Sequence, residues 1–196
     1  MLRAFEIRRV LVVGAAFAVC SVPACREQGE RKAEDPTKVV FEDFSKRIDA
    51  YMKVRKTVVD SVGDLDPTKS QAEITTRATK LASGIMAARA QAKPGDIFTP
   101  EFSALIATLI KQEYSRRPDS VQETREDQQE ELPDFVPKVN TLSPTTYPLA
   151  TFPATLLPLL PRLPEQLEYR VVQNYLVLRD VEANVIVDVM PNAVPA

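Results

Sequence analysis

The uneven distribution of proline divides this chain into two parts that must fold differently. Ten of the 16 prolines lie after residue 132 of 196. Proline lacks a backbone N–H and interrupts helices, so the proline-rich stretch cannot form long helices. Apolar residues recur at helical spacing before that stretch and alternate as in strands after it. The chain is therefore predicted to be an α+β protein with its helices first and its strands last.

An amphipathic helix is predicted over residues 38–62, and a second helix follows it. Residues 63–67 contain the glycine and proline that separate the two. Ser70 and Glu73 form a capping box, in which both side chains satisfy free backbone amides at the start of the second helix. Residues 94–96 end that helix. The apolar positions recur at three-and-four spacing: Phe41, Phe44, Ile48, Tyr51, Met52, Val58, Val59 and Val62, then Ile74, Ala78, Leu81, Ile85, Ala88 and Ala92.

A third helix is predicted from Thr99 to about residue 116. Thr99 supplies a capping hydroxyl, Pro100 suits the first helical position, and Glu101 lies near the positive end of the helix dipole. The three helices are expected to form a small bundle. Its first two members would make an antiparallel hairpin in which alanines allow close approach.

A three-stranded antiparallel meander is predicted over residues 167–190. The turn at Gln173-Asn174 is expected to use asparagine in the left-handed conformation. A small sheet is stable only when one face is buried, so the helices are expected to cover it. One face is marked by Leu167, Tyr169 and Val171, and a matching face on the last strand by Val185, Val187 and Val189.

These elements predict a single α+β domain over residues 38–190. It comprises a helical part (38–118), an acidic and then proline-rich connector (119–166), and the meander. Leucines in the connector are expected to pack across the helices, either on a short helix or along polyproline II. Residues 191–196 would form a tail.

Residues 1–24 have the features of an export signal: basic residues, an apolar run at Val10–Val19, and small residues before a cut. The run is shorter than the roughly 20 residues that cross a bilayer. Residues 25–37 are hydrophilic and are predicted to form a flexible tether. Cleavage before Cys25 by the lipoprotein route would make this cysteine the lipidated N-terminus. The small residues before it also fit ordinary signal peptidase, which would release a soluble product.

Export determines the expected compartment and restricts the classes of partner that the protein can meet. The protein is expected in the periplasm or anchored to the outer membrane of a Gram-negative cell, and otherwise on the cell surface or secreted. Cleavage would leave one of the two cysteines, so no disulfide within the chain is expected. Removal of residues 1–24 would take away Arg3, Arg8, Arg9 and Glu6 and change the net charge from −2 to −4. This negative charge, and more strongly the exported location, argue against nucleic acid as a partner.

The absence of histidine removes several kinds of chemistry. It excludes Ser-His-Asp and Cys-His machinery and imidazole metal ligands. The glycines outside the N-terminal apolar run are too far apart for a nucleotide-phosphate loop, and no Ser-x-x-Lys pair is present. No catalytic residue, metal site or cofactor is therefore assigned.

Several strings resemble those of a family of short, exported bacterial proteins without an assigned activity. The resemblance covers most of residues 38–190, and it implies export but no chemistry. It is carried by Ala92-Lys-Pro-Gly-Asp-Ile-Phe-Thr-Pro100, by Tyr147-Pro-Leu-Ala-Thr151, by Leu163-Pro-Glu-Gln-Leu-Glu-Tyr-Arg170, by Leu178-Arg-Asp180 and by Ile186-Val-Asp188.

The loop from Lys93 to Phe98 is the most distinctive candidate for a ligand site. Asp96 and Lys93 would be its ligand-binding residues. The alternative is structural: Gly95 makes a turn with positive φ, Asp96 caps nearby amides, and Ile97 with Phe98 fills the core.

Two weaker candidates also have structural alternatives. Asp60, Asp64 and Asp66 offer oxygen ligands for calcium, but they lack the glycine and distal glutamate of an EF-hand and suit turns and caps. The prolines at 158, 161 and 164, with Arg162, resemble a polyproline ligand for an SH3-like groove. The leucines between them favour packing instead.

The sequence therefore favours a non-catalytic exported protein that acts through protein or envelope contacts. Its expected partners are an envelope protein and, if Cys25 is acylated, the membrane through a lipid anchor. The alternative is a carboxylate-based hydrolase or a small-ligand-binding protein with its site near the Lys93–Phe98 loop.

Overall fold

The computed structural model describes residues 35–63, 70–116, 135–145, 150–151 and 156–194. All of them belong to one unit that spans residues 34–196. Outside the described residues lie the predicted signal peptide with Cys25, the acidic stretch 119–132, Asp64 and Asp66.

Side-chain caps start each of the three described helices, and those at Ser70 and Thr99 were predicted. Asp35 accepts a hydrogen bond from the N–H of Thr37 at 2.9 Å at the start of the first helix. The hydroxyls of Ser70 and Thr99 each accept one from the N–H three residues ahead, at 3.4 and 3.3 Å. The helices are α1 (Pro36–Val62), α2 (Gln71–Ala88) and α3 (Pro100–Tyr114).

Helix α2 ends earlier than the apolar pattern predicts. Its last residue is Ala88, although the first helix-breaking residue is Pro94. The side-chain amide of Asn140 donates to the carbonyls of Met86 and Arg89, at 2.9 and 3.1 Å. These contacts satisfy carbonyls that a helix terminus leaves free, so a residue distant in sequence helps to set the end of α2.

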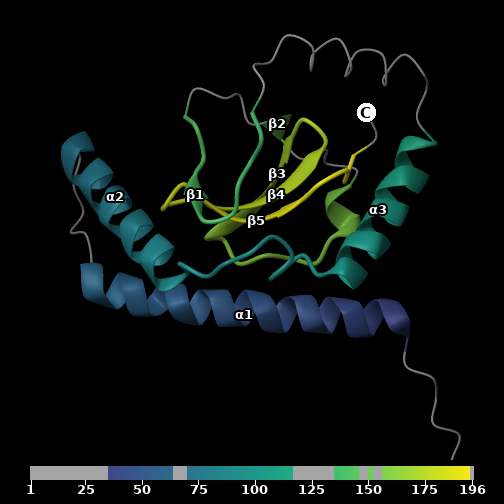
Figure 1. Cartoon of the computed structure of the whole chain (residues 1–196), viewed down its shortest axis with the longest axis horizontal. Helices are drawn as coiled ribbons and strands as arrows, with labels where there is room; N and C mark the ends of the chain where they lie inside the picture. The colour runs from purple at the N-terminus through teal and green to yellow at the C-terminus, as the bar shows by residue number, and fades with distance from the viewer. Residues whose placement is uncertain (1–34, 64–69, 117–134, 146–149, 152–155, 195–196) are drawn as a thin grey trace, which may run out of the picture. The chain divides into compact units, whose positions relative to one another are not determined.

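The three helices do not form the predicted bundle. Helices α2 and α3 lie at opposite ends of α1, and residues 89–99 connect them (Figure 1). Helices α1 and α2 do pack on each other, as predicted. Their close approach depends on a glycine as well as on alanines, because a Cβ atom at Gly84 would clash with Cγ1 of Val58.

The strands form one antiparallel sheet of five strands in the order β1-β5-β4-β3-β2. The predicted meander is its centre, and the prediction of only three strands is wrong. The additional strands pair at the two edges and are two residues long, too short to show alternation in a sequence. The strands are β1 (Thr141–Leu142), β2 (Ala150–Thr151), β3 (Leu167–Val172), β4 (Tyr175–Asp180) and β5 (Val185–Met190).

A β-bulge in β5 overturns the predicted face of that strand. Leu178 pairs with Asp188, whereas the next residue of β4, Arg179, pairs with Ile186, so Val187 has no direct partner. A bulge changes which side of the sheet the following side chains face. Val187 accordingly packs in the large core cluster, but Val189 packs in a second cluster.

The turn between β3 and β4 has the predicted location but a different conformation. Val172 pairs with Tyr175, which leaves the predicted two-residue connection. Gln173, and not Asn174, has the positive φ, at 51°.

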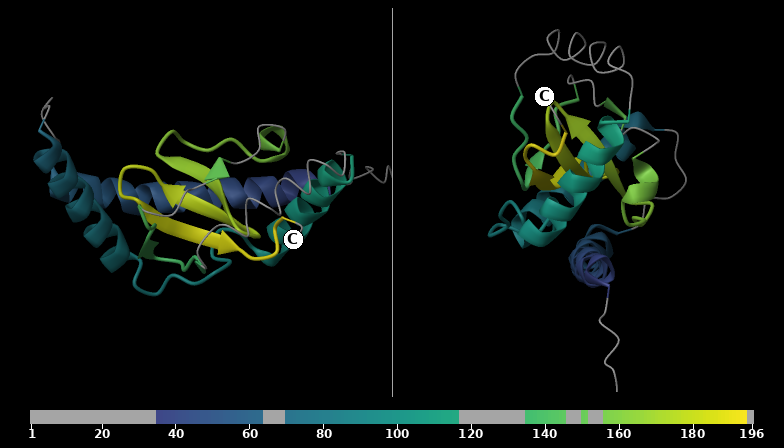
Figure 2. Two further views of the ribbon diagram at one scale, coloured as in Figure 1. Left: turned by 90° about the horizontal axis from the view of Figure 1, so that it is seen from above. Right: turned by 90° about the vertical axis from the view of Figure 1, so that its right-hand side faces the viewer.

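Both faces of the sheet are buried. Helix α1 lies along one side of the sheet (Figure 2), and stacked rings join the helices to β3. The rings of Phe44 and Phe102 are 4.4 Å apart, and Tyr169 lies 6.5 Å from both Phe44 and Phe98. The other face carries a smaller cluster of Val172, Val177, Ile186 and Val189, packed against Phe135, Val139 and Tyr175.

The folded part extends beyond the predicted boundaries at both ends. Helix α1 begins at Pro36, inside the range predicted as a tether. Ala193 and Val194, which the sequence places in a tail, are buried in the core. Among the described residues, no helix combines the length and apolar character needed to cross a membrane.

Candidate functional site

The Lys93–Phe98 loop connects α2 to α3, and its last two side chains belong to the core. Ile97 and Phe98 are 3% and 2% exposed, and the Phe98 ring stacks on Phe102 at 5.4 Å. Gly95 has φ of 89°, a conformation that glycine adopts without strain. The structural roles predicted for these three residues are confirmed.

A buried carboxylate from β5 holds this loop. The two oxygens of Asp188 accept hydrogen bonds from the N–H groups of Gly95, Ile97 and Phe98, at 3.0, 2.7 and 2.8 Å. The N–H of Val189 adds a fourth bond at 2.8 Å. Burial raises the pKa of the Asp188 carboxyl, and the four amides only partly offset that effect. The loop therefore binds an anion, but the anion is part of the same chain.

Asp96 and Lys93 lie at the surface of the loop. The side chain of Asp96 accepts a hydrogen bond from the backbone N–H of Lys93 at 2.8 Å. Arg47 of α1 donates to the backbone carbonyl of Asp96 at 2.8 Å. Asp96 thus caps an amide, as the structural alternative predicts. Its role and that of Lys93 as ligand-binding residues remain predictions.

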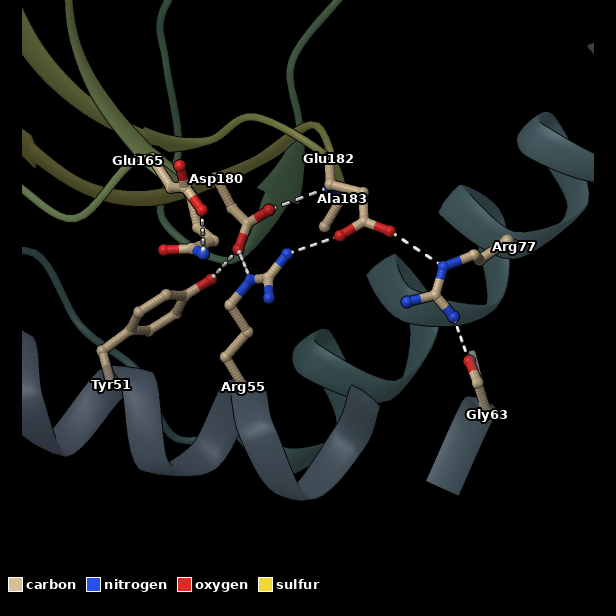
Figure 3. A network of polar contacts seen from close by, with 9 residues as sticks. Tyr51, Arg55, Gly63, Arg77, Glu165, Asp180, Glu182 and Ala183 are labelled. Carbon is tan, nitrogen blue, oxygen red and sulfur yellow. Dashed lines mark hydrogen bonds and ion pairs between the residues drawn. The ribbon is translucent and has the colours of Figure 1, made fainter. Parts of the chain in front are cut away.

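A second buried carboxylate, Asp180 at the end of β4, is held by side chains (Figure 3). Tyr51 Oη and Arg55 Nε of α1 both donate to its Oδ2 atom at 2.8 Å. The N–H of Ala183 donates to Oδ1 at 2.9 Å. Burial, together with the Asp180 charge, raises the pKa of Tyr51 above its ordinary range, so the phenol remains a donor.

The network continues from Arg55 to α2. Arg55 Nη2 pairs with Glu182 at 2.6 Å, and Glu182 pairs with Arg77 of α2 at 3.0 Å. Arg77 also donates to the carbonyl of Gly63 after the end of α1 (Figure 3). Arg89 lies over the Tyr51 ring, 5.2 Å from its centre. The network joins α1, α2 and the β4–β5 turn, and both of its carboxylates pair with arginines of the same chain.

An apolar groove of about 650 Å³ runs between the proline-rich segment and β3. Tyr169 spans its two walls, because its hydroxyl donates to the carbonyl of Pro161 at 3.0 Å. The short 3-10 helix η1 (Leu157–Leu159) belongs to one wall. The described residues that line the groove are Leu157, Pro158, Leu160, Pro161, Arg162, Leu163, Leu167, Glu168, Tyr169 and Arg170.

Charged side chains gather at the β3 wall of this groove. Glu168 pairs with Arg170 at 2.5 Å and with Arg179. Burial opposes ionisation of Glu168, but the hydrogen bonds from both arginines outweigh it, and the pKa of Glu168 is lowered. Within the described part of the chain, Arg170 Nε is a buried donor without a hydrogen-bond partner.

The packing prediction for the proline-rich segment is confirmed for two of its leucines. Leu156 and Leu160 are buried, as the packing alternative predicts, whereas Leu157 is 48% exposed. The backbone at Leu157–Leu159 is 3-10 helical and not polyproline II. The segment is therefore one wall of a groove.

The calcium candidate is only partly within the described residues. Asp60 pairs with Lys56 of the same helix at 2.8 Å. Across the residues that the structure describes, no group of three potential metal-binding side chains occurs.

The roles of Asp180 and Asp188 were not predicted from the sequence, although both residues lie in motifs that carry the family resemblance. A lone aspartate inside an apolar strand is a usable signal, because a buried charge must find partners. The groove had no comparable signal in the sequence, because it forms only when the proline-rich segment packs beside β3.

No protein-family model, curated protein or solved structure matches the chain.

Proposed function

We propose that this chain is an exported, non-catalytic bacterial protein that acts by binding an envelope component in the groove between η1 and β3. It would belong to the family of short exported proteins that its loop and strand motifs resemble. The N-terminal segment would deliver it across the membrane, and an acylated Cys25 would hold it there as a lipoprotein.

The observation that carries this proposal is the chemistry of the groove. Its volume of about 650 Å³ falls in the range of small-molecule sites, and its lining is largely apolar. Glu168 is the one carboxylate among the described lining residues, and its pKa is lowered by two arginines. A general acid or base works best with a pKa near the working pH, so a glutamate whose pKa is lowered suits binding better than proton transfer.

The two buried aspartates support the same conclusion. Asp180 and Asp188 are fully buried, and both oxygens of each accept hydrogen bonds from this chain. Neither is among the residues that line the groove. The carboxylates with the most unusual surroundings therefore hold the fold.

The binding part of the proposal is tested by photo-crosslinking in intact cells. A photoreactive amino acid replaces Leu157 at the groove or, as a matched control, Val181, which is similarly exposed at 44% in the β4–β5 turn. We expect an adduct with a protein or lipid of the envelope from position 157 and not from position 181. Equal labelling from both positions, or no adduct from either, would contradict the proposal.

The export part has its own test. Cells that express the wild type and Cys25→Ser are fractionated, and the protein is followed by immunoblotting. We expect the wild type in the membrane fraction and Cys25→Ser in the soluble exported fraction. Equal release of both proteins would show that no lipid anchor exists, and retention of both in the cytoplasm would contradict export.

A further inference from the structure

We infer that the occupant of the groove is an anionic amphiphile: a molecule with an acyl chain that lies along the leucines and a negative head that meets Arg162 and Arg170. This inference rests on the proposed binding function and names the chemical class of its ligand. The inference depends on the charged side chains at the groove, on its apolar lining and on the backbone N–H groups of its walls.

The charges of the groove favour a negative head. Arg162 and Arg170 line it together with Glu168. Glu168 is already shared between Arg170 and Arg179, so the local balance remains positive. Arg162 is exposed, and the side chain of Arg170 is 24% exposed. Guanidinium groups bind carboxylate and phosphate oxygens with strong, charge-assisted hydrogen bonds.

The apolar lining favours an acyl chain as the remainder of the ligand. Leu157 is 48% exposed, and Leu163 and Pro161 are half-buried beside it. Burial of such surface by an apolar chain is favourable in proportion to the area removed from water. An exposed leucine next to an arginine therefore fits a ligand that is apolar along its length and charged at one end.

The backbone of the groove argues against a peptide as the occupant. Peptides that bind beside a strand need free N–H and C=O groups along an edge. Two of the wall's prolines, Pro158 and Pro161, have no N–H to donate. The N–H of Leu160 donates within η1, and the N–H of Leu167 donates to Pro164. At these four positions of the wall, the backbone N–H is therefore missing or already used within the chain.

The test compares probes that share one chain and differ in the head. Isothermal titration of the full-length protein uses decanoate, decyltrimethylammonium and decyl maltoside below their micellar concentrations, and acetate as the head alone. We expect decanoate to bind at least about tenfold more tightly than the other decyl probes, as charge-assisted hydrogen bonds require, and acetate not to bind measurably. Equal binding of all three decyl probes, or binding of none, would overturn the inference.

Groove variants and matched controls locate the binding. Arg162→Ala is expected to weaken decanoate binding by about tenfold, while Arg116→Ala, at another exposed arginine, leaves it unchanged. Leu157→Gln is expected to weaken it by several-fold, and Val181→Gln to have no effect. The N-terminal apolar run is the same in all four variants, so loss of binding only in the groove variants assigns the site. Unchanged binding in both groove variants would place the amphiphile elsewhere and contradict the inference.

The two proposals fail in different ways. Position 157 can crosslink to an envelope protein while decanoate does not bind. The proposed function then stands, and the amphiphile is wrong. If position 157 captures nothing, the proposed function fails as well.

Discussion

The Lys93–Phe98 loop and the groove beside η1 both offer hydrogen-bond donors to an anion, but the donors of the loop are occupied by a carboxylate of the chain, whereas the groove keeps one exposed arginine, Arg162. Three amides of the loop donate to Asp188, which is completely buried. At the groove, Arg162 is exposed and Arg170 has an unpartnered buried donor among the described residues. The distinctive sequence of the first region thus marks a structural contact, and the second region, which has no distinctive motif, forms the proposed binding surface.

This contrast separates stability from function in a way that mutations can test. Residues of the first kind should change the free energy of unfolding and leave binding intact in the protein that remains folded. The exposed residues of the groove, Arg162 and Leu157, should do the reverse.

The largest loss of stability is expected from Asp180→Ala. It leaves Arg55 and Tyr51 without the carboxylate that they share, and removal of one partner of a buried ion pair costs about 3–5 kcal/mol. Denaturant unfolding measures the loss. Glu182→Gln is the control, because Glu182 is 40% exposed and its pairs with Arg55 and Arg77 are partly solvated. Equal stability of the two variants would mean that burial of Asp180 does not matter.

The substitution Glu168→Gln at the groove is expected to cause a smaller loss of stability, and this loss depends on pH. Its folded-state pKa is lowered by Arg170 and Arg179 against the opposing effect of burial. Its contribution to stability is therefore present above the ordinary glutamate pKa of about 4.3 and is lost as the pH falls through the lowered value. The difference in unfolding free energy between the wild type and Glu168→Gln should shrink as the pH falls through this window. A difference that grows on acidification would contradict the assignment.

The contribution of Asp188 to stability should change with pH in the opposite direction to that of Glu168. Its folded-state pKa is raised by burial, so its contribution is most favourable below the ordinary aspartate pKa and declines as the pH rises through the raised value. A comparison of the pH dependence of unfolding in the wild type and in Asp188→Asn checks this direction. The same slope for Asp188 and Glu168 would break the contrast between the two regions.

The smallest change in stability is expected from Leu157→Gln. Leu157 is 48% exposed, and substitutions at such surface positions usually change the unfolding free energy by less than about 0.5 kcal/mol. Thermal or denaturant unfolding should therefore give a value near that of the wild type, while decanoate binding falls. A large destabilisation would mean that Leu157 packs in the core and does not form a free groove wall.

Local signals in the sequence predicted the helices well. Each cap that it places, at Ser70 and Thr99, is present in the structure. A cap involves residues within one helical turn, so it can be predicted from a single sequence. The bundle prediction was wrong because the position of α2 and α3 on α1 depends on a sheet that lies much later in the chain.

Non-local effects explain what the sequence could not predict about the sheet and the site. The bulge opposite Leu178 and Arg179 sends Val189 to the other face, and no alternation pattern reveals such a shift. Asp188 and the loop amides that it holds are 90 to 93 residues apart. The loop motif was recognised as distinctive, but the reason lies in a strand at the other end of the fold.

The central claim is that Asp188, and not Asp96, holds the Lys93–Phe98 loop in its conformation. The unfolding free energies of Asp188→Asn and Asp96→Asn test this claim most directly. An asparagine at position 188 keeps one acceptor oxygen but turns an NH2 group toward two of the four amides, which lose their acceptor at a cost of about 2–4 kcal/mol. An asparagine at the exposed position 96 can still accept from Lys93, so the cost should stay below about 0.5 kcal/mol. A neutral Asp188→Asn, or an Asp96→Asn that costs as much, would contradict the account.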